Sequence, residues 1–217
     1  MLIERKTTAD GAIIGIWHIV ETENQLLSLF KQPDKLQHQM AAISNTEKRC
    51  EKLAVRALLH DLTGEEKLIG YLSDGKPYLS DGSFYISISH TKHYACIILH
   101  SIQIVGIDIE AKTSRAARIQ QRFLSPAEYT ISNQTSGFVV PLLFWTAKEA
   151  LFKLVSNPAL DFVNHIQVTD INWNEQIITA SIASIDHPFK LFFTIEPDYV
   201  LSHVCASTEA TEIHNLV

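Results

Sequence analysis

Apolar residues recur along this chain with two different periods. Repeats of three and four residues, which place apolar side chains on one face of a helix, predict helices over 22–32, 34–42, 44–64, 125–133 and 141–156. Alternating or short continuous apolar runs predict strands over 12–20, 84–89, 94–100, 104–110, 165–170, 176–184, 188–195 and 199–206. The mixture of both kinds of element indicates an α+β fold.

Local signals mark the ends of the longer helices. Ser44 and Glu47 have the spacing of a capping box, and Gly64 is a typical helix stop. Ser125 and Glu128 have the same capping-box spacing at the start of a later helix. We interpret this second pair as structural.

A long helix followed by a strand hairpin occurs twice, over 46–100 and 141–206, although the two halves share few identical residues. We therefore expect two similar lobes with pseudo-twofold symmetry, each a small antiparallel sheet packed with a long helix. The expected N-terminal lobe covers 1–105 and the C-terminal lobe 106–217. The two form one fused pseudo-dimeric unit with the functional site at their interface.

Composition and charge narrow the function classes. The 217 residues, 46% of them hydrophobic and 19% charged, are enough to bury the core of one large or two small domains. Eighteen Lys and Arg against 24 Asp and Glu give a formal charge of −6, which argues against a broad basic face for nucleic acid. A polyanionic ligand would need a local basic pocket.

Neither a membrane segment nor a disulfide framework is expected. No run approaches the roughly 18 apolar residues of a membrane span, and the N-terminal segment is interpreted as a first strand without a cleavage site. Cys50, Cys96 and Cys205 lack CxxC spacing and lie in apolar-periodic sequence, so we interpret them as buried structural thiols. We expect a reducing, cytoplasmic location.

The segment GIDIE at 106–110 places two carboxylates side by side. In a strand, Asp108 and Glu110 point to one face and Ile107 and Ile109 to the other. Adjacent carboxylates repel unless a cation lies between them, and oxygen ligands favour a hard ion such as Mg2+, completed by water and substrate phosphates. The alternative is the exposed polar face of an edge strand, and the residues alone leave both open.

The segment WTAKEALFK at 145–153 places Glu149 and Lys153 four residues apart, on one helical face. A surface ion pair would explain this spacing. The helix is apolar over most of its circumference, however, so we expect both groups to be half-buried and Glu149 to need a partner, which a metal with a phosphate would provide.

Further polar residues cluster in loops and on one helix. Ser89 and His90 lie at a hairpin loop, where His90 is either a phosphate donor or a solvated turn residue. His90 and His93 have the spacing of a zinc pair but lack further ligands, so zinc is disfavoured. Lys76 lies in a turn, and a helical stripe that is either solvated or anion-binding contains Arg49, Lys52 and Arg56.

Five segments in one order resemble the 4'-phosphopantetheinyl transferase superfamily. They are GKP at 75–77, FYISISHT at 84–91, GIDIE at 106–110, RFLSPAEY at 122–129 and FWTAKEALFK at 144–153. The resemblance is close over residues 75–153. The chain length is similar to that of the two-lobed Sfp type rather than the short type that forms trimers.

The resemblance implies an enzyme, a holo-carrier-protein synthase. Coenzyme A would donate its 4'-phosphopantetheine group to a serine of an apo acyl, peptidyl or aryl carrier protein, leaving adenosine 3',5'-bisphosphate. Mg2+ is the implied cofactor, and fatty-acid, polyketide or nonribosomal peptide biosynthesis the implied setting. The partners are thus coenzyme A and a carrier protein rather than nucleic acid or a membrane, and the protein is expected to be a monomer.

The resemblance also assigns roles to single residues. The implied metal ligands are Asp108, Glu110 and Glu149. The implied catalytic residues are Glu149, Lys153 and Asp108, with Glu149 as the base, directly or through a metal-bound water.

Coenzyme A binding is assigned to residues from several segments. The implied set is Lys76, Ser89, His90, Arg49 and Lys148. Arg49 is the candidate for the 3'-phosphate, with Arg56 left open, and Lys35 is a weaker candidate.

We expect a carrier protein to dock on the segment from Arg115 through Arg118 to Arg122, with Phe123 and Leu124 as apolar contacts. The alternative is that these arginines are only solvated.

Two other functions stay open. One is a Mg2+-dependent coenzyme A pyrophosphohydrolase, and the other is a non-catalytic module that binds coenzyme A or a carrier protein.

Overall fold

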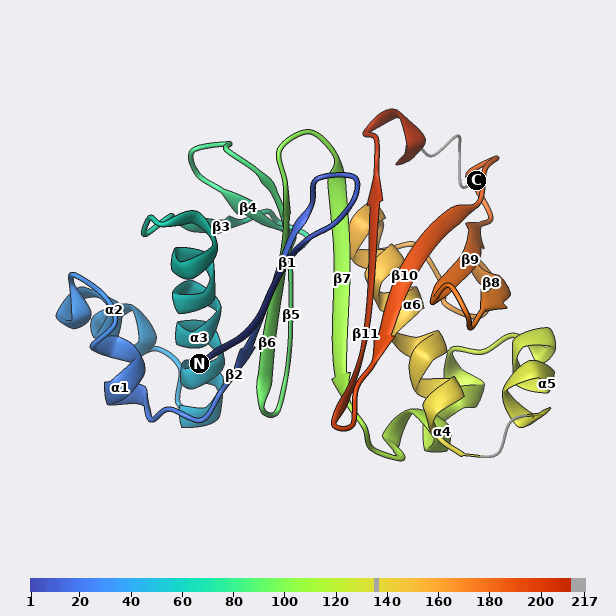
Figure 1. Cartoon of the computed structure of the whole chain (residues 1–217), viewed down its shortest axis with the longest axis horizontal. Coiled ribbons are helices and arrows are strands. Elements are labelled where there is room, and N and C mark those ends of the chain that lie inside the picture. Colours follow the sequence, from blue (N-terminus) through green and yellow to red (C-terminus); the bar gives the residue numbers. More distant parts are fainter. Residues whose placement is uncertain (135–136, 212–217) are drawn as a thin grey trace.

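Two antiparallel sheets lie side by side in the centre of the molecule, with helices on the outside (Figure 1). The computed structural model describes residues 1–134 and 137–211. The α+β fold class predicted from the sequence is confirmed, with one large sheet in each lobe.

The first sheet has the strand order β1-β2-β6-β5. Its strands are β1 (Leu2–Thr7), β2 (Ile13–His18), β5 (Tyr85–Thr91) and β6 (Tyr94–His100). The helices of this lobe are α1 (Glu23–Leu27), α2 (Pro33–Met40) and α3 (Thr46–Thr63), and a separate small hairpin contains β3 (Ile69–Tyr71) and β4 (Pro77–Leu79).

The second sheet has the strand order β7-β11-β10-β9-β8. Its strands are β7 (Ile104–Ala111), β8 (Ile166–Asn172), β9 (Ile177–Ile182), β10 (Phe189–Ile195) and β11 (Tyr199–Ala206). The helices are α4 (Arg115–Ile119), α5 (Pro126–Gln134) and α6 (Val139–Val155), with short 3-10 turns η1 (Gln120–Arg122) and η2 (Glu209–Thr211).

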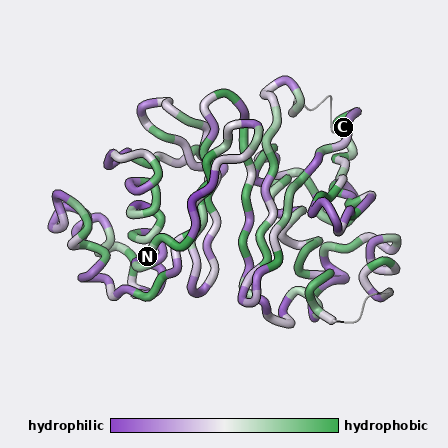
Figure 2. The backbone as a smooth tube through the Cα atoms, viewed as in Figure 1, coloured by the Kyte–Doolittle hydropathy of each residue, from purple (hydrophilic) through white to green (hydrophobic). Residues whose placement is uncertain are grey.

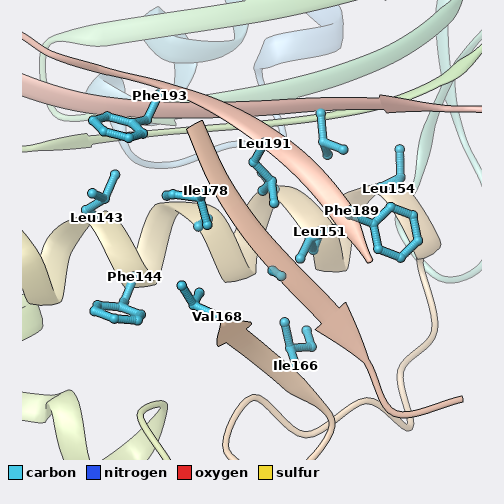
Figure 3. Packing of buried hydrophobic residues seen from close by; sticks show 14 of the residues in the cluster. Leu143, Phe144, Leu151, Leu154, Ile166, Val168, Ile178, Phe189, Leu191 and Phe193 are labelled. Carbon is cyan, nitrogen blue, oxygen red and sulfur yellow. The ribbon is translucent and has the colours of Figure 1, made fainter. Parts of the chain in front are cut away.

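Three hydrophobic clusters hold these elements together. One lies between α3 and the first sheet, and one between α6 and the second sheet, where Leu143 and Leu151 face Ile178 and Leu191 (Figure 3). The third joins the two sheets, with Ile14 and Ile16 of β2 packed in one cluster with Ile107 of β7. Hydrophobic residues accordingly concentrate along the central strands (Figure 2).

The two lobes repeat one arrangement. The strand order β2-β6-β5 corresponds to β7-β11-β10, and a long helix covers each set, α3 against β2 and β6 and α6 against β7 and β11. The sheets separate between His100 and Ile104, so the expected boundary at residues 105 and 106 falls inside β7. The division into two domains at that boundary stays a prediction.

The structure corrects the sequence prediction at the N-terminus. We expected a single first strand, whereas residues 1–18 form the hairpin of β1 and β2. β1 was missed because its sequence, LIERKT, does not alternate apolar and polar residues, as it lies at the sheet edge with half of its side chains exposed.

Helix ends also differ in detail from the prediction. The predicted cap Ser44 is not used, because Asn45 takes that position and its side chain accepts a hydrogen bond from the Lys48 amide. Gly64 ends α3 in the left-handed conformation, as predicted, at φ 75°. The capping box of Ser125 and Glu128 is present, with the Ser125 amide donating to Glu128 Oε2 at 2.8 Å.

Cys96 is buried, Cys50 and Cys205 are partly buried, and all three are free thiols. Within residues 1–134 and 137–211, every helix is too short or too polar to cross a lipid bilayer.

Candidate active site

The strand β7 separates apolar from acidic side chains, as the alternation of GIDIE predicts. Ile107 and Ile109 belong to the cluster between the sheets. Asp108 and Glu110 therefore point to the opposite face of β7, toward α6. Gly106 lets the two elements approach, because a Cβ atom there would lie 2.0 Å from the Ala150 carbonyl oxygen.

Helix α6 presents Trp145, Glu149 and Lys153 on one stripe, because residues four apart share a helical face. These three side chains line one pocket with both carboxylates of β7. The first lobe contributes lining residues from β5. The full lining consists of Ile88, Ser89, His90, Asp108, Glu110, Trp145, Glu149 and Lys153.

Asp108 is the centre of this arrangement. Its Oδ1 atom accepts hydrogen bonds from Ser89 Oγ and from Lys153 Nζ, both at 2.7 Å. Its Oδ2 atom is buried and has no hydrogen-bond partner. One oxygen of this carboxylate is therefore held by both lobes, and the other is left for a ligand.

The environment of the other two carboxylates, Glu149 and Glu110, disfavours their ionised forms. Burial, reinforced by the charge of Asp108, raises the pKa of Glu149 to about 7, although Lys153 opposes the shift. Burial and Asp108 also raise the pKa of Glu110, which the hydrogen bond from Trp145 partly offsets. Burial alone would lower the pKa of Lys153, but Asp108 outweighs it and raises that pKa.

Hydroxyl groups on β5 connect the two lobes beside the pocket. Ser87 Oγ accepts a hydrogen bond from the Ile107 amide at 3.2 Å, and Thr91 Oγ1 accepts one from the Ala111 amide at 3.4 Å. With the bond from Ser89 to Asp108, they fix β5 alongside β7 where the sheets share no backbone ladder. Side chains from both lobes are thus held in register at the site.

Glu51 is a neighbour of the pocket that the sequence analysis missed. Its Oε2 atom lies 3.2 Å from His90 Nδ1, at a half-exposed position of the histidine. Glu51 belongs to α3, so the contact joins residues 39 positions apart, and no local pattern marks it.

Lys76 and Arg49, two predicted coenzyme A ligands, lie outside the pocket lining. Lys76 Nζ donates to the Leu154 carbonyl at 3.0 Å, beside the C-terminal end of α6, and burial lowers the pKa of this lysine. Arg49 pairs with Glu23 at 2.8 Å and donates to the Ile43 carbonyl at 2.7 Å. Lys76 thus borders the lobe interface, whereas Arg49 anchors the start of α3.

Lys148 faces away from the pocket. It is fully buried, and its Nζ atom donates to the carbonyls of Phe123 and Phe162 and to Glu128. No part of it is open to a ligand, which corrects its assignment to coenzyme A binding.

The expected carrier-docking segment also needs correction. Arg115, Arg118 and Arg122 are exposed, but Phe123 and Leu124 are 1% and 4% exposed and belong to the core of the second lobe. The two apolar residues are therefore not available as docking contacts. Arg115 lines a small cavity beside Glu110 and Trp145.

The carboxylates fit a hard cation that would be completed by other ligands. In the described part of the chain, no three His, Cys, Asp or Glu side chains are gathered closely enough to hold a metal ion by themselves. The pocket nevertheless combines a partnerless buried oxygen on Asp108 with the raised pKa of Glu110 and of Glu149. Mg2+ commonly uses one or two carboxylates together with substrate phosphates.

Residues 104–207 match the family model of the 4'-phosphopantetheinyl transferase superfamily. The match covers 104 of the 217 residues, and over this segment the chain is similar to the superfamily. The matched segment holds Asp108, Glu110, Glu149 and Lys153, whereas the pocket residues Ser89 and His90 precede it. A comparison with curated proteins found no match.

The match to this superfamily supports a phosphopantetheine transferase activity in general. Enzymes of the superfamily use coenzyme A as substrate and a carrier protein as partner, typically with a divalent metal. The match confirms the resemblance on which the sequence analysis relied. The match ends at residue 207, close to the end of β11, so it covers the second sheet and α6.

Proposed function

We propose that this protein transfers the 4'-phosphopantetheine group of coenzyme A to a serine of an apo acyl, peptidyl or aryl carrier protein. The reaction depends on Mg2+ and releases adenosine 3',5'-bisphosphate. The observation that carries the proposal is one pocket that brings Glu149 and Lys153 of α6 together with Asp108 of β7, and whose lining also includes Ser89 and His90 of the first lobe.

The residues of this pocket suit an attack on a pyrophosphate. Glu149 is the proposed base, because its pKa of about 7 allows it to take the proton of the attacking serine near neutral pH. Lys153 carries the positive charge that stabilises the departing phosphate oxygen. His90 is half-exposed beside Glu51, and it is the proposed contact for a phosphate of the nucleotide.

Asp108, Glu110 and Glu149 are the proposed metal ligands. When bound, Mg2+ supplies charge neutralisation on the pyrophosphate. Ser89 and Lys153 both donate hydrogen bonds to Asp108 Oδ1. The other oxygen, Oδ2, has no hydrogen-bond partner and is the atom proposed to bind the metal.

The direct test is the intact mass of apo acyl, peptidyl and aryl carrier proteins after incubation with the protein, coenzyme A and Mg2+, with EDTA as control. We expect a gain of one phosphopantetheine mass that EDTA prevents. Cleavage of coenzyme A with no gain on any carrier would instead identify a pyrophosphohydrolase. Binding of coenzyme A without cleavage would identify a binding module.

Lys76→Ala is expected to weaken coenzyme A binding more than turnover. Lys76 lies at the lobe interface beside α6 and outside the pocket lining, so its charge acts on the bound nucleotide rather than at the reacting phosphorus. We expect KM for coenzyme A to rise about 10-fold, as for the loss of one charge-assisted hydrogen bond, with kcat within about twofold. A fall in kcat at unchanged KM would contradict this role.

The pH dependence should follow Glu149. A base must be deprotonated to act, so kcat/KM for coenzyme A is expected to rise with pH and level off above the pKa of Glu149, about 7. A bound cation favours the ionised carboxylate and moves the midpoint to lower pH. A profile recorded at several Mg2+ concentrations checks this, and a midpoint that rises with Mg2+ would exclude Glu149 as the titrating group.

A further inference from the structure

Trp145 is held between two phenylalanine rings at the wall of the proposed metal site. Its ring centroid lies 5.1 Å from that of Phe123, in an edge-on arrangement, and 5.7 Å from that of Phe162. The indole Nε1 atom donates to Glu110 Oε1 at 3.2 Å. The direction of this hydrogen bond therefore depends on the two phenylalanines.

A single buried lysine holds both of these phenylalanines. Lys148 Nζ donates to the Phe123 carbonyl at 2.8 Å and to the Phe162 carbonyl at 2.7 Å. Its third hydrogen bond goes to Glu128 Oε2 at 2.7 Å. All three protons of the ammonium group are used, and they fix two backbone segments that meet at Trp145.

Glu128 in turn is fixed on both sides. Its Oε2 atom accepts from the Ser125 amide at 2.8 Å, and its Oε1 atom accepts from the Val168 amide at 2.7 Å. Lys148 and Glu128 thereby tie α6 to the segment before α5 and to β8. Both side chains are at most 1% exposed.

A buried ion pair of this kind is a poor source of stability. Removing two charges from water costs about as much as their attraction returns, and apolar replacements of similar volume are often as stable. What such replacements cannot reproduce is the fixed direction of three hydrogen bonds. The pair is therefore suited to positioning the groups around it.

We propose that Lys148 is a positioning residue, which orients Trp145 through the carbonyls of Phe123 and Phe162 and so holds the Glu110 carboxylate in place for the metal. The role of Glu110 as a ligand rests on the proposed function. The positioning of Trp145 does not, so the two parts can be tested separately.

The test uses the double variant Lys148→Met with Glu128→Leu, since a single substitution would leave one buried charge unpaired and threaten folding. The protein carries 5-fluorotryptophan, and 19F NMR without metal or substrate reports the tryptophans, with Trp145→Phe assigning the Trp145 signal. We expect that signal to shift or broaden in the double variant. The matched control is Ile182→Val, which lies in the same core and is not a hydrogen-bond partner of Lys148. It should leave the Trp145 signal unchanged.

Metal dependence supplies the second readout. The double variant and Trp145→Phe are each expected to need about 10-fold more Mg2+ for half-maximal transfer, as for the loss of a residue that orients a metal ligand. KM for coenzyme A at saturating Mg2+ should stay within about twofold. An unchanged Trp145 signal together with an unchanged Mg2+ requirement in a folded double variant would overturn the proposal.

The outcomes separate the two hypotheses. If the wild-type protein modifies no carrier, the proposed function fails, whereas the 19F comparison still decides whether Lys148 orients Trp145. A shifted Trp145 signal with unchanged Mg2+ dependence would contradict the link to Glu110.

Discussion

Replacing Glu149 by glutamine is expected to abolish most of the transfer activity and, in the absence of metal, to make the protein more stable above neutral pH. The loss of a general base typically costs about 10²–10⁴-fold in rate, and here one proposed metal ligand is lost as well. Glutamine has nearly the same shape as glutamate, so the pocket should keep its packing.

The gain in stability follows from the direction of the pKa shift. Burial raises the pKa of Glu149 from 4.5 to about 7, so between these values the folded protein holds a proton that the unfolded chain has released. The stability of the wild-type protein therefore falls as pH rises through this window. One pKa unit corresponds to about 1.4 kcal/mol. Because Glu149 is only partly buried and solvent screens its charge, we expect a gain of about 1–2 kcal/mol at pH 8.

Urea denaturation in EDTA at pH 5 and pH 8, together with the carrier-mass assay, measures both effects. The matched control is Glu47→Gln, an exposed carboxylate in the first turn of α3, which should change neither quantity. Asp108 is less suitable for this experiment, because its removal would also leave Lys153 without its partner. Near-normal activity of the Glu149→Gln variant would contradict the proposed role of Glu149. So would a stability gain over wild type that is smaller at pH 8 than at pH 5.

Local geometry accounts for the part of the site that could be predicted from the sequence. The alternation of a strand fixed the common face of Asp108 and Glu110, and the helical repeat fixed that of Glu149 and Lys153. Both relations depend only on backbone geometry over a few residues. The pairing of β7 with α6, which brings the two faces together, entered through the resemblance.

The relations that were missed join residues far apart in the chain. His90 meets Glu51 within the first lobe, and Lys148 meets Glu128 within the second, in each case between elements that no local period connects. Lys148 and Glu149 are adjacent in sequence, yet one is in the core and the other in the pocket, because successive helical residues are rotated by about 100°. A motif names such neighbours together without indicating that they face different ways.

Gly106→Ala is expected to have the largest effect on folding of any single methyl group added near the site. The new Cβ atom would lie 2.0 Å from the Ala150 carbonyl oxygen and 3.1 Å from the Leu154 amide nitrogen. Both are backbone atoms of α6, which can move only as a unit, so β7 and α6 must separate. Overpacking typically costs about 1–3 kcal/mol, and we expect the upper end of this range.

We also expect a large loss of transfer activity in Gly106→Ala, even where the protein stays folded. The same separation of β7 and α6 moves Asp108 away from Lys153. Displacement of reacting groups by about 1 Å can cost about 10²-fold in rate. Gly15→Ala is the matched control: it occupies the corresponding strand of the first lobe, and its Cβ atom would meet Leu58 Cδ1 at 2.7 Å and Leu62 Cδ2 at 2.8 Å. These are the ends of flexible side chains that can rotate, so we expect the lower end of that range, about 1 kcal/mol, with transfer retained.

Chemical denaturation and carrier-mass assays of both alanine variants under one set of conditions compare the two positions. Any stabilisation from restricting the unfolded chain is common to both substitutions and cancels in the comparison. The difference therefore reports how closely each strand approaches its helix. Equal losses of stability and activity in the two variants would mean that the contact between β7 and α6 does not set the geometry of the site.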